Sequence, residues 1–161
     1  SYRETIASAA LSGLASLNDV RGMDLAVNYI SRPKMSMATF SAFAILSTLG
    51  TQSPELSERA RIVLEKSYTD FQSWVDGERW AFKSQVLATL GGLKNKNALP
   101  FLENEAANNP HEEFREMAKA AIAAINKPDD PSIDSKKEKI RLLKMKTLGA
   151  PHRAHSAGEL F

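Results

Sequence analysis

The sequence contains no cysteine, and this absence removes several classes of protein. Disulfide-bonded secreted scaffolds, thiolate metal sites and cysteine nucleophiles all need that side chain. No uninterrupted apolar run approaches the roughly 20 residues of a membrane-spanning helix, and the N-terminus lacks the layout of a signal peptide. β-branched residues are sparse, whereas Ala and Leu are prominent, which favours helices. We therefore expect a soluble all-α protein, with the cytoplasm as its compartment.

Groups able to carry out chemistry are scarce, because the chain has only three histidines. The run His111-Glu-Glu-Phe-Arg115 is superficially similar to the zinc-peptidase pattern His-Glu-x-x-His, but Arg115 occupies the position of the second ligand. Pro110 and the two acids suit the start of a helix instead. His152 and His155 lack a further ligand nearby, and we interpret them as incidental.

Other catalytic patterns are also missing from the sequence. Asp129 and Asp130 lie in a proline-bounded turn, where solvated carboxylates are expected. No glycine-rich phosphate loop and no local Ser/His/Asp motif is present. We predict no catalytic, cofactor-binding or metal-binding residue in this chain.

The charge of the chain is unevenly distributed. The net charge is +2, but residues 1–131 carry 14 Lys and Arg against 16 Asp and Glu, whereas residues 132–161 carry 7 against 3. Nucleic-acid binding needs a basic face that displaces counterions from phosphates. A nucleic-acid partner is therefore not expected for the slightly acidic body.

A leucine-rich motif recurs along the chain. Leu11-Ser-Gly-Leu-Ala-Ser-Leu is similar to Leu87-Ala-Thr-Leu-Gly-Gly-Leu, and shorter copies begin at Leu46 and Ile122. The separations of 35, 41 and 35 residues correspond to two short helices with their turns. Each copy ends a helix, and a polar turn and a second amphipathic helix follow. Before the second helix of the second copy, Ser53 suits an N-cap, Pro54 the first turn, and Gly50 a left-handed position that ends the preceding helix.

One helix pair cannot cover its own apolar stripe, so a continuous core forms only when successive pairs stack. We therefore predict an α-solenoid of about three and a half antiparallel helix pairs over residues 1–127, an α-α superhelix. A bundle of unrelated helices is the alternative, because Leu-x-x-Leu alone is a common pattern.

The second and third copies are separated by six extra residues, and large aromatic side chains gather there. This junction is a possible interaction surface, since aromatic side chains bury much area at a low entropic cost. The alternative is that the rings only fill a loose turn between helix pairs. The candidate residues are Tyr68, Phe71, Trp74 and Trp80.

Residues 128–161 form a separate segment that begins at a proline-bounded linker. Residues 136–146 hold six cations and one acid, and Ile140, Leu143 and Leu148 suit a short apolar face that packs on the last repeat. A Lys-rich stretch of this kind suits RNA or an acidic membrane, but a solvated terminal helix is the commoner outcome. The rest of the segment has no periodicity and is expected to be a flexible tail.

With these residues laid out, the chain resembles HEAT repeats. The run Phe114-Arg-Glu-Met-Ala118-Lys-Ala-Ala121-Ile122 is similar to the family helix Val-Arg-x-x-Ala-x-x-Ala-Leu. The resemblance covers about residues 1–127 and implies a HEAT-like solenoid.

A narrower resemblance points to the helical C-terminal region of M1-family zinc aminopeptidases that contain HEAT repeats. It rests on the run from Arg3 to Tyr29 and on Asn97-Ala-Leu-Pro-Phe-Leu-Glu103. The resemblance implies that the zinc ligands and the general base lie in a preceding catalytic domain. It also implies that these helices cover the substrate cavity, so that the peptide substrate meets them only indirectly. None of the family's catalytic residues carries over onto this sequence.

Three functions follow as hypotheses. The first is a non-catalytic scaffold domain of such a peptidase, whose partner is the preceding catalytic domain; a chain that begins at Ser1 rather than Met leads us to expect a piece of a longer protein. The second is a stand-alone HEAT adaptor for another protein. The third, a HEAT-like DNA glycosylase, needs a cationic concave face, against which the acidic body argues.

Overall fold

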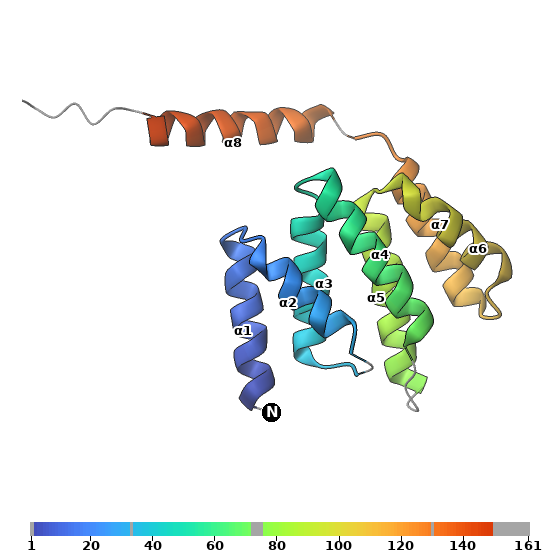
Figure 1. The fold of residues 1–161 in the computed structure, drawn as a ribbon. Coiled ribbons are helices and arrows are strands. Elements are labelled where there is room, and N and C mark those ends of the chain that lie inside the picture. Colours follow the sequence, from blue (N-terminus) through green and yellow to red (C-terminus); the bar gives the residue numbers. More distant parts are fainter. Residues whose placement is uncertain (1, 33, 72–75, 130, 150–161) are drawn as a thin grey trace, which may run out of the picture. The chain divides into compact units, whose positions relative to one another are not determined.

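The computed structural model describes the chain except for residues 1, 33, 72–75, 130 and 150–161. Every regular element in the described residues is a helix (Figure 1), so the predicted all-α fold is confirmed. The chain divides into two compact units, residues 1–126 and 127–161. Within the described parts, no helix has both the length and the apolar character needed to cross a bilayer.

The first unit consists of seven α-helices and one short 3₁₀ helix. Their bounds are α1 Tyr2–Ser16, α2 Arg21–Ile30, α3 Met37–Gly50, α4 Pro54–Asp70, α5 Asp76–Leu93, η1 Lys96–Ala98, α6 Leu99–Asn108 and α7 Glu112–Asn126.

The helices of this unit form two rows. Helix α1 packs on α3, α3 on α5, and α5 on α7, so these four make the first row. Helix α2 packs on α4, and Tyr68 of α4 meets Phe101 of α6 edge-on with ring centroids 5.3 Å apart, which makes α2, α4 and α6 the second row. Figure 1 shows the pairs following one another from α1 and α2 to α6 and α7.

The four copies of the leucine motif fall one on each helix of the first row. Leu11, Leu46 and Leu87 are completely buried, and Ile122 is half-buried against the same core. Full burial of a leucine side chain stabilises a fold by about 1.5–3 kcal/mol. The recurring position is therefore a recurring core position, one step along the row each time.

Two glycines at matched positions of this motif allow neighbouring helices to approach closely. Gly50 and Gly91 each lie four residues after the first leucine of their copy. A Cβ on Gly50 would lie 2.5 Å from Cδ2 of Leu93, and one on Gly91 would lie 3.0 Å from Cα of Ala121. The left-handed conformation predicted for Gly50 is wrong, because no described glycine has a positive φ. Gly50 remains helical, and lack of space is the reason for a glycine there.

Among the described residues, positive φ angles occur at Asn18 (52°), two residues after the end of α1, and at Lys94 (50°), directly after α5. Asparagine tolerates this conformation better than most residues, so Asn18 was recognisable as a turn residue, whereas Lys94 was not. The predicted N-cap is confirmed: the hydroxyl of Ser53 accepts a hydrogen bond from the backbone N–H of Leu56 (3.2 Å), and Pro54 opens α4.

The extra residues between the second and third motif copies lengthen helices. Helix α4 has 17 residues, whereas α2 and α6 have 10 each, and α5 has 18. The N-terminal part of α5 and the C-terminal part of α4 therefore extend beyond the length of the neighbouring pairs.

The second unit contains one helix, α8 Pro131–Gly149. It extends on both sides of the predicted residues 136–146. Ile140, Leu142, Leu143 and Met145 are all exposed. Successive residues of an α-helix are rotated by about 100°, so Leu142 and Met145 lie on other sides of the helix than Ile140 and Leu143. The apolar side chains are thus spread around α8, and its packing on the last repeat stays a prediction.

Neighbouring glycines on α5 test whether close approach holds the first row together. Gly91→Leu should lower the free energy of unfolding by about 1–3 kcal/mol, because the side chain would push α7 away. Gly92→Leu is the matched control, since a Cβ there meets no atom within 4 Å, and its better helix propensity should raise stability by up to about 1 kcal/mol. Urea unfolding followed by circular dichroism measures both, and equal effects would contradict the role of Gly91.

Candidate functional site: a cleft beside Trp80

A cleft of the first unit lies between the start of α5 and the turn that joins α6 to α7. Its volume is about 500 Å³. Because α5 and α7 are adjacent in the first row, their N-terminal ends bring side chains from distant parts of the sequence together. The lining residues are Asp76, Arg79, Trp80, Lys83, Asn109, Pro110, His111, Glu113 and Phe114.

Trp80 forms an exposed wall of this cleft and is 47% exposed. Its indole N–H donates a hydrogen bond to Oε2 of Glu113 (3.1 Å), which fixes the ring between α5 and α7. Trp80 also lines an apolar groove between α5 and α7. An aromatic ring that is held in place and still exposed is suited to contact with a partner, because little entropy is lost when the contact forms.

Tyr68 lies behind the cleft, and three polar groups surround it. Its hydroxyl donates to Oε2 of Glu105 (2.6 Å), and Nδ2 of Asn109 donates to both of these oxygens (3.2 Å and 2.7 Å). The ammonium of Lys83 lies 4.8 Å from the centre of the Tyr68 ring. Burial, together with the hydrogen bond to Glu105, raises the pKa of Tyr68 above its usual range. The tyrosine therefore stays neutral and joins α4, α5 and α6 behind the cleft.

The four predicted surface aromatics have different surroundings. Tyr68 and Phe71 are almost fully buried, whereas Trp80 is exposed in the cleft. The Phe71 ring stacks on Phe82 with centroids 4.1 Å apart, and Phe82 meets Phe43 edge-on at 5.4 Å. Tyr68 and Phe71 thus form part of the core beneath the junction, and Trp74 lies outside the described residues.

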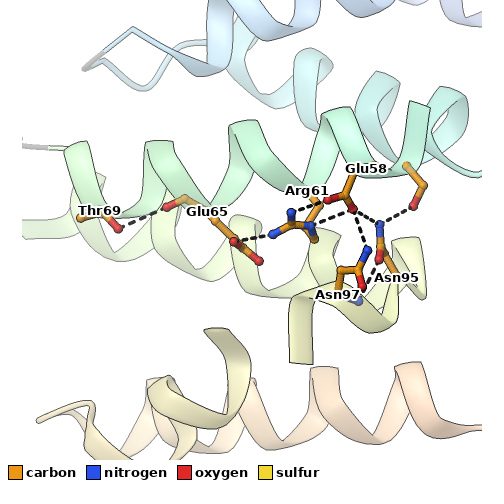
Figure 2. Close-up of polar contacts among 7 residues, drawn as sticks. Glu58, Arg61, Glu65, Thr69, Asn95 and Asn97 are labelled. Carbon is orange, nitrogen blue, oxygen red and sulfur yellow. Dashed lines mark hydrogen bonds and ion pairs between the residues drawn. The ribbon is translucent and has the colours of Figure 1, made fainter. Parts of the chain in front are cut away.

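A cluster of charged and amide side chains joins α4 to the turn between α5 and α6 (Figure 2). Arg61 donates to Glu58 and, at 2.8 Å, to Oε2 of Glu65. Asn95 and Asn97 each donate through Nδ2 to Oε2 of Glu58, at 3.0 Å and 3.2 Å. One carboxylate therefore receives bonds from its own helix and from the turn of the next helix pair.

The pKa values of the two glutamates in this cluster are shifted in opposite directions. Hydrogen bonds from Arg61 first, and then from Asn97 and Asn95, lower the pKa of Glu58 to about 2. Burial raises the pKa of Glu65, against the opposing hydrogen bond from Arg61. Oε1 of Glu65 is buried and has no hydrogen-bond partner among the described groups. The cluster acts as a structural clamp, because Asn95 and Asn97 bond from the next helix pair to the carboxylate that Arg61 holds on α4.

Groups for catalysis do not converge at the cleft. His111 meets the ring of Phe114 edge-on at a centroid distance of 5.9 Å, and the described lining residues include no hydroxyl or thiol nucleophile. Among the described residues, no group of three or more His, Asp and Glu side chains is placed to hold a metal ion. His152 and His155 lie outside those residues.

Sequence reasoning identified Trp80 but missed Glu113, Glu105 and Asn109. Both acids belong to helices that the pattern predicts, but nothing in the spacing indicates that Glu113 meets residue 80 or that Glu105 meets residue 68. These contacts depend on the packing of α5 on α7 and of α4 on α6.

No protein-family model, no curated protein and no solved structure matches this chain.

Removing the Tyr68 hydroxyl tests the network behind the cleft. Tyr68→Phe should lower the free energy of unfolding by about 1 kcal/mol, because Asn109 still pairs with Glu105 and only one hydrogen-bonding group is lost. Tyr29→Phe is the control, since the Tyr29 ring keeps its contact with Arg32. A loss that is equally large for Tyr29→Phe in urea unfolding would contradict the network.

Acid unfolding tests the clamp around Glu58. Because its folded pKa is about 2 and its ordinary value is 4.5, the wild-type chain should lose this group's contribution as the pH falls from about 4.5 to 2. Glu58→Gln lacks that contribution, so the stability difference between the two proteins should shrink over this window. Unfolding by urea at several pH values measures it, with the exposed Glu103→Gln as control. A difference independent of pH would rule out the low pKa.

Proposed function

We propose that the chain is a non-catalytic scaffold built as a HEAT-like α-solenoid, a right-handed superhelix of about three and a half helix pairs. Its role is to hold a partner polypeptide rather than to transform a substrate. In this proposal the leucine motifs are equivalent steps of one stack, and the cleft beside Trp80 belongs to the contact surface.

The matched glycines support the solenoid more than any other observation. Gly50 faces Leu93 of the next first-row helix, and Gly91 faces Ala121 of the one after that. A bundle arranged around one centre gives no reason for the same motif position to contact the following helix twice. Stacked repeats do, because each repeat contacts chiefly its neighbours.

The cleft supports the choice of a polypeptide as the partner. The exposed Trp80 ring and the ammonium of Lys83 line it, together with Arg79 and Asp76, which form an ion pair with each other. Aromatic rings and arginines are enriched where proteins bind one another. The mixture of both charge signs is unsuited to a polyanion, whose recognition needs a predominantly basic face.

We further propose that the partner is the preceding catalytic domain of an M1-family zinc aminopeptidase, whose substrate cavity this domain covers or shapes. This assignment rests on the sequence resemblance alone. The zinc would belong to the catalytic domain, because the described residues here offer no ligand group. A stand-alone adaptor is the second candidate, and the exposed Trp80 ring favours it, since the ring suits any protein partner.

Hydrolysis and gene context test this assignment. The purified chain with added zinc should release no product from aminoacyl-anilides above the rate of the zinc blank, and turnover that a chelator abolishes would contradict a non-catalytic role. A His-Glu-x-x-His motif encoded upstream in the same reading frame would support the peptidase domain, whereas a start codon directly before the codon of Ser1 would support the adaptor.

Hydrogen exchange of the full chain tests the stack itself. Amides of α3 and α5 should exchange most slowly, because each of these helices has first-row neighbours on both sides. Amides of α1, which contacts only α3 within that row, should exchange at least tenfold faster. Uniform protection across α1, α3 and α5 would indicate one cooperative globular core and contradict the solenoid.

A further inference from the structure

The outer surface of the first row has an unusual lack of charge. No Asp, Glu, Lys or Arg occurs in residues 5–18, 35–54, 84–93 or 120–126, which together cover most of α1, all of α3 and the C-terminal parts of α5 and α7. Many of these positions are nevertheless exposed, for example Ala9, Ala44 and Ala88. Solvated helix faces normally carry charged residues.

The exposed positions on α1 and α3 include a stripe of uncharged residues on each helix. They recur every three or four residues, as in Tyr2, Ile6, Ala9 and Gly13 on α1 or Met37, Phe40, Ala44 and Thr48 on α3. The opposite stripe of each helix holds the buried leucine motif. We call the exposed surface of these stripes and of the four uncharged stretches the uncharged face.

The two halves of the uncharged face have different shapes, because side chains project from one half and a groove runs along the other. On α1 and α3 large apolar side chains project from it: Tyr2 is 82% exposed, Met37 65%, Ile6 52% and Phe40 48%. Between α5 and α7 it is hollowed by a groove of about 470 Å³. The groove is lined mostly by small residues, with Trp80 and Met117 as its large side chains: Trp80, Ser84, Gln85, Ala88, Gly91, Gly92, Met117, Ala120, Ala121 and Ala124.

We propose that the uncharged face binds a second copy of this chain across a two-fold axis. In such a pair, α1 and α3 of one copy lie against α5 and α7 of the other, and the reverse contact forms at the same time. The projecting apolar side chains then enter the groove of the partner twice. This inference does not depend on the proposed function.

The area available matches what a stable dimer needs. The four helices have 15, 14, 18 and 15 residues, which at about 1.5 Å per residue and about 10 Å between axes gives roughly 900 Å². The uncharged stretches account for roughly 650 Å² of it by the same arithmetic. Dimers of ordinary size bury about 800 Å² on each partner, with an apolar centre and a polar rim.

Charge also permits pairing with a second copy. Residues 1–131 carry 14 cations and 16 anions, so two copies repel each other weakly. The charges on α5 and α7, such as Arg79 and Glu116, lie in their N-terminal halves, at the edge of the uncharged stretches. A highly charged partner would instead lose hydration at this face without gaining a counter-charge.

Sedimentation equilibrium of the full chain over micromolar to millimolar concentrations tests the proposal. The average mass should rise from 17.7 kDa and level off at twice that value. Phe40→Glu on the projecting half and Ala88→Glu in the groove should each raise the dissociation constant at least tenfold, because a two-fold interface contains every substitution twice. Both residues are exposed, so circular dichroism should show an unchanged fold.

Ile62→Glu is the matched control, because Ile62 is an apolar residue of α4, 51% exposed, in the second row. It should leave the dissociation constant unchanged. A wild-type chain that stays monomeric up to millimolar concentration would overturn the proposal. Any partner of the uncharged face would then be something other than a second copy of this chain. A mass that rises past twice 17.7 kDa without levelling, or an equal loss for Ile62→Glu, would also overturn it.

Discussion

The fold of the first unit depends on the close approach of successive first-row helices. Each of these helices carries its buried leucine on one side, and it can shield that residue only if the next helix comes near enough to exclude water. Gly50 and Gly91 permit that approach, because a Cβ at either position would collide with Leu93 or with the backbone of Ala121. The second row then closes the core from the other side, through aromatic contacts and the Glu58 clamp.

The candidate site is a consequence of that packing. Once α5 and α7 lie side by side, the start of α5 and the turn before α7 face one another across a cleft, and Glu113 can hold Trp80. Tyr68 is buried at the end of α4 and contacts two cleft residues, Asn109 and Lys83, whereas Phe71 stacks on Phe82 in the core. The site therefore combines a rigid buried support with one exposed ring, which suits recognition of a polypeptide.

Polar groups divide between two tasks in this molecule. Asn95 and Asn97 join the Glu58 carboxylate of α4 to the turn of the next helix pair. Hydrogen bonds lower the pKa of Glu58, whereas burial raises the pKa of Glu65. Residues 5–18, 35–54, 84–93 and 120–126 of the first-row helices and their adjoining turns, in contrast, carry no charge. The charged cluster around Glu58 thus helps to hold one helix pair against the next, whereas the uncharged face offers exposed apolar side chains for contact.

The sequence by itself determined the all-α class, the positions of the leucine motifs and the N-cap at Ser53, because these follow from local periodicity and capping chemistry. Only the tertiary structure decided which aromatics are exposed. Tyr68 is buried where it meets Glu105, 37 residues along the chain, and Phe71 is buried where its ring stacks on Phe82 of α5. The tertiary structure also decided the role of Gly50. A glycine that relieves a steric contact and a glycine that ends a helix look alike in a sequence, and only the position of Leu93 distinguishes them.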